Sequence, residues 1–165
     1  MLTACISTGP TNNKEFASIG KISDLNGTYL NKGDDGSEGK YEHYLSNILW
    51  PNDKSIDHTL IDTIVVSSVS DTQLSVKGLH DNSIVKEQIF IDGKDFKIQS
   101  GRIHLSNNFD GAFNLVMGIS NRTIDLGIDA SGHGKLRREE NAVGMALIPF
   151  VINEKKDVRF LKVEE

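Results

Sequence analysis

The amino-acid sequence predicts a mostly β protein, built as an antiparallel meander barrel or a β-sandwich of about ten strands with one amphipathic helix. Three observations predict this fold class. Apolar and polar residues alternate with period two over much of the chain beyond residue 61, which is typical of antiparallel strands with one buried face. Turn-forming residues separate these runs at intervals of roughly 8 to 12 residues. Helical periodicity occurs in one segment, residues 37–50.

Length and composition indicate a single folded domain, which we expect at residues 24–165. The chain has 165 residues, of which 38% are hydrophobic and 25% are charged, so it can bury a core. The formal net charge of −5 argues against a nucleic-acid partner, because phosphate binding depends on clustered Lys and Arg. No apolar run reaches the roughly 18 residues of a membrane-spanning helix.

The first expected elements are a short strand at 25–31 and the helix at 37–50. Asp35 and Glu38 have capping-box spacing, and Pro51 ends the helix because proline disfavours helical geometry in the residue before it. Positions i, i+3, i+4, i+7 and i+8 of the helix carry apolar or aromatic residues, which are Tyr41, Tyr44, Leu45, Ile48 and Leu49.

Every element expected after the helix is a strand. The alternation and its turn signals predict strands at 63–69, 73–79, 84–91, 96–99, 102–106, 113–119, 124–128, 135–138, 143–152 and 158–163. Short connections favour a meander, and closure into a barrel would remove exposed edges. Pro149 interrupts the longest apolar strand, so we expect a sheet edge or a bulge there.

The N-terminal residues Leu2-Thr3-Ala4-Cys5 include the single cysteine of the chain. They resemble the lipobox of bacterial lipoproteins, in which small residues precede a cysteine that is diacylated on sulfur. The resemblance implies that residues 1–5 are the remnant of a signal peptide and lipobox, and that cleavage occurs before Cys5. It further implies that Cys5 carries the lipid, with palmitate as an expected acyl group, because its sulfur is the nucleophile.

Residues 6–23 are rich in small and polar residues and lack sustained periodicity, so we expect a flexible linker. A linker of about 18 residues has a reach of about 20 to 25 Å, enough to hold a domain just off a bilayer. Ile6, not Asp, follows the cysteine, and by the sorting rule of Gram-negative lipoproteins this implies the outer membrane. The expected location is the bacterial cell envelope, with the membrane as a partner through the lipid anchor.

Gly27-Thr28-Tyr29 and Arg159 resemble the minimal pattern of the lipocalin and calycin group. In that group a Gly-x-Trp of the first strand packs under a basic residue of the last strand. The resemblance implies that Tyr29 and Arg159 close the bottom of the barrel through a cation–π contact, and that a small apolar ligand binds inside. The sequence departs from the family pattern because Tyr29 replaces Trp and the middle motif is missing.

Tyr41, Tyr44 and Trp50 form an aromatic cluster along the expected helix. Two interpretations are open. The cluster is either a lid over a ligand in the barrel mouth or the buried face of a helix packed on a sheet.

Candidate metal sites are weak. Asn31, Gly33, Asp35 and Glu42 partly match a calcium-binding loop, but Gly33 stands where a ligand is needed, so a solvated turn fits better. The five histidines lack the converging spacing of a zinc site; they are His43, His58, His80, His104 and His133. We therefore expect no metal and no cofactor.

Two carboxylate pairs, Asp125 with Asp129 and Glu139 with Glu140, are the candidates for hydrolytic chemistry. Glycoside hydrolysis needs two carboxyl groups about 5 to 10 Å apart across a cleft, whereas these pairs fit a solvated strand face better. The basic residues Lys135, Arg137 and Arg138 precede the second pair, and we expect a solvated hairpin there. The sequence does not predict an enzyme.

The sequence thus predicts a membrane-anchored envelope lipoprotein whose domain acts as a non-enzymatic binding module for another envelope protein. Two alternatives stay open. One is a calycin-like carrier of a small apolar ligand, and the other is a hydrolase that uses the carboxylates.

Overall fold

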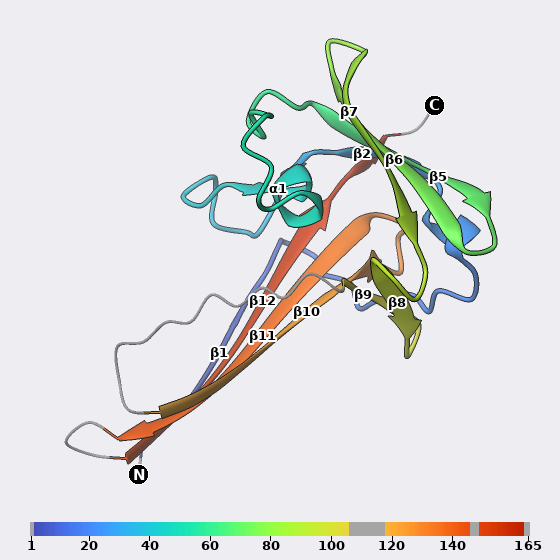
Figure 1. Cartoon of the computed structure of the whole chain (residues 1–165). Helices are drawn as coiled ribbons and strands as arrows, with labels where there is room; N and C mark the ends of the chain where they lie inside the picture. Colours follow the sequence, from blue (N-terminus) through green and yellow to red (C-terminus); the bar gives the residue numbers. More distant parts are fainter. Residues whose placement is uncertain (1, 106–117, 146–148, 164–165) are drawn as a thin grey trace.

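The computed structural model describes residues 2–105, 118–145 and 149–163 of the chain, and these residues confirm the mostly β prediction. They form a six-stranded sheet, a five-stranded sheet and a small two-stranded sheet (Figure 1). The predicted strand at 113–119 lies largely outside the described residues.

The six-stranded sheet has the order β1-β12-β11-β10-β9-β8. Its neighbours are antiparallel except for β1, which runs parallel to β12. The strands are β1 (Leu2–Thr8), β8 (Phe96–Gln99), β9 (Arg102–Leu105), β10 (Gly118–Ile128), β11 (Gly134–Met145) and β12 (Pro149–Phe160).

The five-stranded sheet has the order β13-β2-β5-β6-β7 and is antiparallel throughout. Its strands are β2 (Gly27–Leu30), β5 (Thr63–Ser70), β6 (Gln73–His80), β7 (Ser83–Ile91) and β13 (Lys162–Val163). The small sheet pairs β3 (Lys32–Gly33) with β4 (His43–Tyr44), and a 3-10 helix, η1, spans Ile22–Leu25.

The core lies between the two large sheets. Strand alternation directs Ile64 of β5, Phe96 of β8, and Val158 and Phe160 of β12 into this layer, where each is at most 1% exposed. The five-stranded sheet covers only one end of the six-stranded sheet (Figure 1). The described strands form two open sheets and do not close into a barrel.

The missing closure has a structural cause. Among the described residues the six-stranded sheet ends at β1 and β8, and these two strands do not pair with each other, so the sheet stays open. The five-stranded sheet likewise ends at β7 and β13. Pro149 is the first residue of β12, a position where proline is tolerated because its missing N–H takes little from the ladder.

The helix predicted at 37–50 is much shorter in the structure. The α-helix α1 covers only Leu45–Leu49, and β4 precedes it. Glu38 and Gly39 adopt positive φ angles of 54° and 83°, which a helix does not tolerate. Pairing of β4 with β3 also holds residues 43–44 in an extended form. Only the last turn of the predicted helix, Leu45–Leu49, is therefore helical, and the apolar spacing there reflects its packing on the core.

The segment expected to be a flexible linker, 6–23, differs from that expectation in the structure. After β1, residues 9–20 cross the outer face of the six-stranded sheet, and we call them the strap. Phe16 forms a β-bridge with Asp129, and the amide of Ile19 donates to the carbonyl of Gly101 at 3.0 Å. Ile19 and Ile22 are 3% and 4% exposed, so burial of these apolar side chains holds the segment in place.

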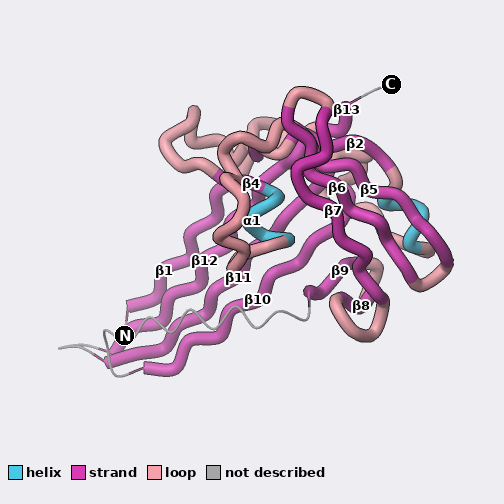
Figure 2. Tube along the Cα trace, turned by 45° about the horizontal axis from the view of Figure 1, so that its top comes forward, coloured by secondary structure: helices cyan, strands magenta, loops and turns pink. Residues whose placement is uncertain are grey.

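The strands β10, β11 and β12 extend past the core as a single layer together with β1. We call this layer the ribbon; it comprises residues 2–8, 118–124, 138–145 and 149–156. Figures 1 and 2 show the ribbon projecting away from the two-sheet body. No helix in the described part of the chain is long and apolar enough to cross a membrane.

Candidate functional site

A buried ion cluster lies beneath the strap on β11 and β12. Asp157 is 1% exposed and accepts hydrogen bonds from Nε and Nη2 of Arg137, each at 2.8 Å. Lys135 Nζ lies 2.8 Å from the same carboxylate, and Asn13 of the strap donates to it at 2.7 Å. Burial raises the pKa of Asp157, but the hydrogen bonds from Arg137, Lys135 and Asn13 outweigh it and hold that pKa well below its ordinary value.

Phe16 of the strap closes this cluster. Its ring centroid lies 4.6 Å from the guanidinium of Arg102, 5.2 Å from that of Arg137 and 5.4 Å from Lys135 Nζ, the geometry of cation–π contacts. The expected solvated hairpin at Lys135 and Arg137 is therefore wrong, since these residues are 2% and 4% exposed. The sequence did not predict that the strap buries Lys135 and Arg137, because the strap lies more than 100 residues away from them in the chain.

The carboxylates Asp125 and Asp129 are also buried, at 7% and 2% exposure, which corrects the solvated strand face. Asp125 accepts a hydrogen bond from Arg102 at 2.7 Å and lies 3.3 Å from His104. Asp129 accepts from the amide of Ser131 in the β10–β11 turn at 2.8 Å. Asp129 directly follows β10, four positions after Asp125, and both carboxylates are occupied by donors of the fold itself.

A second cluster joins the loop after β3 to the ribbon. Asp35 is 6% exposed and lies 2.8 Å from Lys156 Nζ and 3.1 Å from His43 Nε2. Burial raises the pKa of Asp35, whereas hydrogen bonds from Lys156 and Ser37 lower it to well below the usual range. Burial and Lys156 together lower the pKa of His43, so its imidazole is neutral at pH 7.

The residues of the calcium-like loop point to other partners. The Asn31 side chain is fully buried. Its nitrogen donates to the carbonyls of His58 and Ile61 at 2.8 and 2.9 Å, and its oxygen accepts from the Ser46 amide at 2.8 Å. Glu42 pairs with Lys32 at 2.8 Å. Each oxygen donor therefore serves the fold, and the loop does not assemble a cation site.

The predicted barrel-closing pair does not form. Tyr29 is 4% exposed, and the cation over its ring is Lys162, with Nζ 5.7 Å from the centroid. Arg159 contacts Asp34 at 3.1 Å instead. The physical reason is strand alternation, because Arg159 precedes the fully buried Phe160 and so faces the opposite side of β12 from the core.

The three residues of the predicted lid lie in different environments. Tyr41 is 53% exposed in a loop, with Lys156 Nζ 4.7 Å from its ring centroid. The Tyr44 hydroxyl donates to Glu42 at 2.8 Å. Trp50 is 4% exposed and belongs to the core, so the shortened helix leaves no shared aromatic face.

The space between the sheets is small. A cavity of about 90 Å³ lies there, lined by apolar side chains of both sheets that include Leu74, Phe90 and Leu126. Pockets that bind small molecules measure about 300 to 1,000 Å³. Phe113 and Leu115, on the strand predicted at 113–119, lie outside the described residues.

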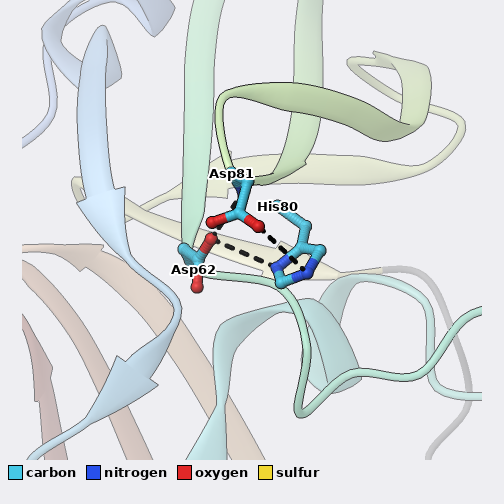
Figure 3. Close-up of side chains that lie close together, drawn as sticks. All are labelled: Asp62, His80 and Asp81. Carbon is cyan, nitrogen blue, oxygen red and sulfur yellow. Dashed lines mark hydrogen bonds and ion pairs between the residues drawn. The ribbon is translucent and has the colours of Figure 1, made fainter.

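Asp62, His80 and Asp81 meet at the surface, where β6 turns into β7 (Figure 3). His80 Nδ1 lies 3.3 Å from Asp62, and Nε2 lies 3.7 Å from Asp81. The carboxylates therefore flank opposite nitrogens of one imidazole, whereas a single metal ion binds only one of them. Asp81 and Asn82 have φ angles of 48° and 61°, the turn geometry of tight hairpins. The pair Asp-Asn is the sequence signal that could have predicted this turn.

Cys5 lies in β1 with its thiol exposed. In the parallel pairing of β1 with β12 it is opposite Asn153, whose Nδ2 is 3.9 Å from the sulfur. The four residues from Cys5 to Thr8 remain paired with β12 in the same register. Cys5 is thus joined directly to the ribbon.

No strand of the described residues pairs with the outer edge of β7. This strand is the last of its sheet and pairs with β6 along its length. Ile84, Val85 and Ile89 are 54%, 44% and 42% exposed. An edge strand with exposed aliphatic side chains is a template for pairing with another chain.

The structure thus separates the residues that the sequence grouped. Tyr29 and Arg159 contact different partners, as do the three aromatic residues. No protein-family model matches the chain, and neither a curated protein nor a solved structure matches it.

Proposed function

We propose that this chain is a lipoprotein of the bacterial envelope, anchored in the outer membrane through acylated Cys5, and that its domain is a non-enzymatic binding module for another envelope protein. The observation that carries the anchor is the sequence Leu2-Thr3-Ala4-Cys5, whose cysteine is single in the chain and exposed. Acyl chains supply about 0.8 kcal/mol per buried methylene, which suffices to hold a folded domain at a bilayer.

The anchor is tested with Cys5→Ser in the complete precursor, expressed in a Gram-negative host that is fed an alkyne-tagged palmitate. The unaltered protein is expected in the outer-membrane fraction with the tag, and the variant in a form without it. Ser7→Ala, a neighbouring change on β1 that keeps the thiol, is the control. An untagged unaltered protein contradicts the proposal.

The binding role is supported by the edge of β7. Its exposed aliphatic residues, Ile84, Val85 and Ile89, and its unshared backbone groups suit a partner that adds one strand to the sheet. The other two functions receive less support. The cavity of about 90 Å³ is small for a carried ligand, and Asp125 and Asp129 are bound to internal donors.

Strand addition is tested by placing a photo-crosslinking amino acid at Ile89 in living cells. A discrete crosslinked product of defined mass is expected from this position. The matched control is Leu60, which is 54% exposed, against 42% for Ile89, but lies in a loop. Equal products from both positions, or none from Ile89, contradict a binding edge at β7.

A further inference from the structure

Along the ribbon, the chemistry of β11 and β12 changes abruptly, while the neighbouring β10 keeps Ser120 opposite Ala142. Near the body, β11 and β12 carry charged residues in register, with Arg138 opposite Lys156, Glu139 opposite Lys155 and Glu140 opposite Glu154. Next comes a pair of asparagines at 141 and 153. Beyond that pair, no residue at 142–145 or 149–152 is polar; the sequences are Ala-Val-Gly-Met and Pro-Phe-Val-Ile. We call these eight residues the apolar tip.

The apolar tip differs from an ordinary strand pair. Successive residues of a strand face opposite sides, so a sheet with one wet face alternates between apolar and polar residues. The apolar tip has no polar residue at either parity, which is the pattern of strands surrounded by apolar material on both faces. No described element lies over this end of the ribbon in either view (Figures 1 and 2), and Ile152 is 38% exposed.

The lipobox cysteine is level with the start of the apolar tip. Cys5 is opposite Asn153, the last polar position before the tip. Leu2, Thr3 and Ala4 are opposite Phe150, Val151 and Ile152. If Cys5 is the first residue of the mature protein, its acyl chains leave the ribbon at the level where the apolar residues begin, and the three residues beside the tip are removed.

We propose that the apolar tip inserts into the membrane surface beside the acyl chains of Cys5, so that the ribbon stands on the bilayer and holds the two-sheet body away from it. This inference rests on the proposed function, because Cys5 brings the tip to the lipid. A four-residue tip is about 13 Å long, which is enough to pass the headgroups and reach the acyl boundary, where interfacial elements bury about 5 to 10 Å.

The sheet edges limit the depth of insertion. Backbone groups without hydrogen-bond partners are costly in hydrocarbon. Once residues 2–4 are removed, the outer edge of β12 in the tip lacks the strand that covers it. The tip therefore occupies the interfacial region, where headgroups and water satisfy this edge, and does not span the bilayer.

Because the chain has one cysteine, its removal allows a single new cysteine to be labelled. Cys5→Ser removes it, and Ile152→Cys then accepts a single environment-sensitive fluorophore in the full-length chain. An N-terminal histidine tag tethers the protein to phosphatidylethanolamine–phosphatidylglycerol vesicles that contain a nickel-chelating lipid, so the tag replaces the acyl anchor. Leu60→Cys in the same background is the matched control, and circular dichroism verifies that both labelled variants are folded.

The fluorophore at 152 is expected to shift to the blue on vesicles and to lose fluorescence when the lipids are brominated, whereas the one at 60 stays unchanged. Val151→Asp in the labelled chain is expected to abolish the shift. A solvent-like spectrum at 152 on tethered vesicles overturns the inference. A blue shift in the absence of vesicles also overturns the inference, because the apolar tip then packs against a second copy of the chain and not against lipid. If the tip inserts into vesicles but Cys5 is not acylated in cells, this inference stands and the proposed anchor is wrong. The two failures are therefore distinguishable.

Discussion

Asp157 is the residue through which the outer face of the six-stranded sheet is held together. Its carboxylate neutralises two buried cations, Lys135 and Arg137, and also binds Asn13 of the strap. Two cations buried without this carboxylate would be costly, because buried charges are tolerated only when they are paired. The cluster therefore couples folding of β11 and β12 to docking of the N-terminal segment.

We expect Asp157→Asn to lower the free energy of unfolding at pH 7 by about 3 to 5 kcal/mol, the cost of breaking a buried ion pair from one side. Urea unfolding followed by circular dichroism measures the change. Asp71→Asn, an exposed position on the β5–β6 turn, serves as the control and should change little. Equal stability of the two variants contradicts the role assigned to Asp157.

The same residue predicts a dependence on pH. The pKa of Asp157 in the folded protein is held below its ordinary value of 3.8, so its contribution to stability is complete above about pH 4 and is lost as the pH falls toward the folded value. Asp35 has a lowered pKa as well and adds to the same loss. The free energy of unfolding, measured at steps from pH 7 to pH 2, should therefore fall less steeply for Asp157→Asn than for the unaltered chain.

At the scale of elements, the close approach of β3 to β12 depends on glycine. A Cβ atom at Gly33 would contact Val158 and would lie 2.7 Å from Cε1 of Phe160. Both neighbours are at most 1% exposed, so neither can move into solvent. This contact sets the position of the loop that brings Asp35 and His43 to Lys156 of the ribbon.

We expect Gly33→Ala to destabilise the fold by about 1 to 3 kcal/mol, as overpacking of a close-packed core does. Thermal unfolding measures it. Gly20→Ala is the matched control, because a Cβ there meets only the flexible Asp24 carboxylate at 3.7 Å. A Gly33→Ala variant as stable as the Gly20→Ala variant would show that β3 is free to shift.

At the scale of the whole molecule, the structure has two ends of different character. The ribbon carries Cys5 and the apolar tip, while β7 lies in the body at the other end (Figure 1). A protein that stands on its tip thus presents the β7 edge away from the membrane. If Cys5 is the anchor and the edge of β7 binds a partner, as proposed, both can act at the same time.

The sequence by itself determined some of the local elements. The strand predicted at 143–152 was wrong, because its residues belong to the end of β11 and the start of β12. Period-two alternation predicted β5, β6, β8 and β9 to within about one residue at each end, because side-chain alternation and turn residues are local properties of a strand. The charged residues 138–140 and the apolar residues 142–145 and 149–152 likewise follow one another in the sequence. The lipobox stays a prediction from the sequence.

Only the tertiary structure decided which elements lie together. The strap covers Lys135 and Arg137 across more than 100 residues, and no local pattern records such a contact. The parallel pairing of Cys5 with Asn153 joins positions 148 residues apart. The openness of both sheets follows from such long-range pairings, since strand alternation is the same in an open sheet and in a barrel.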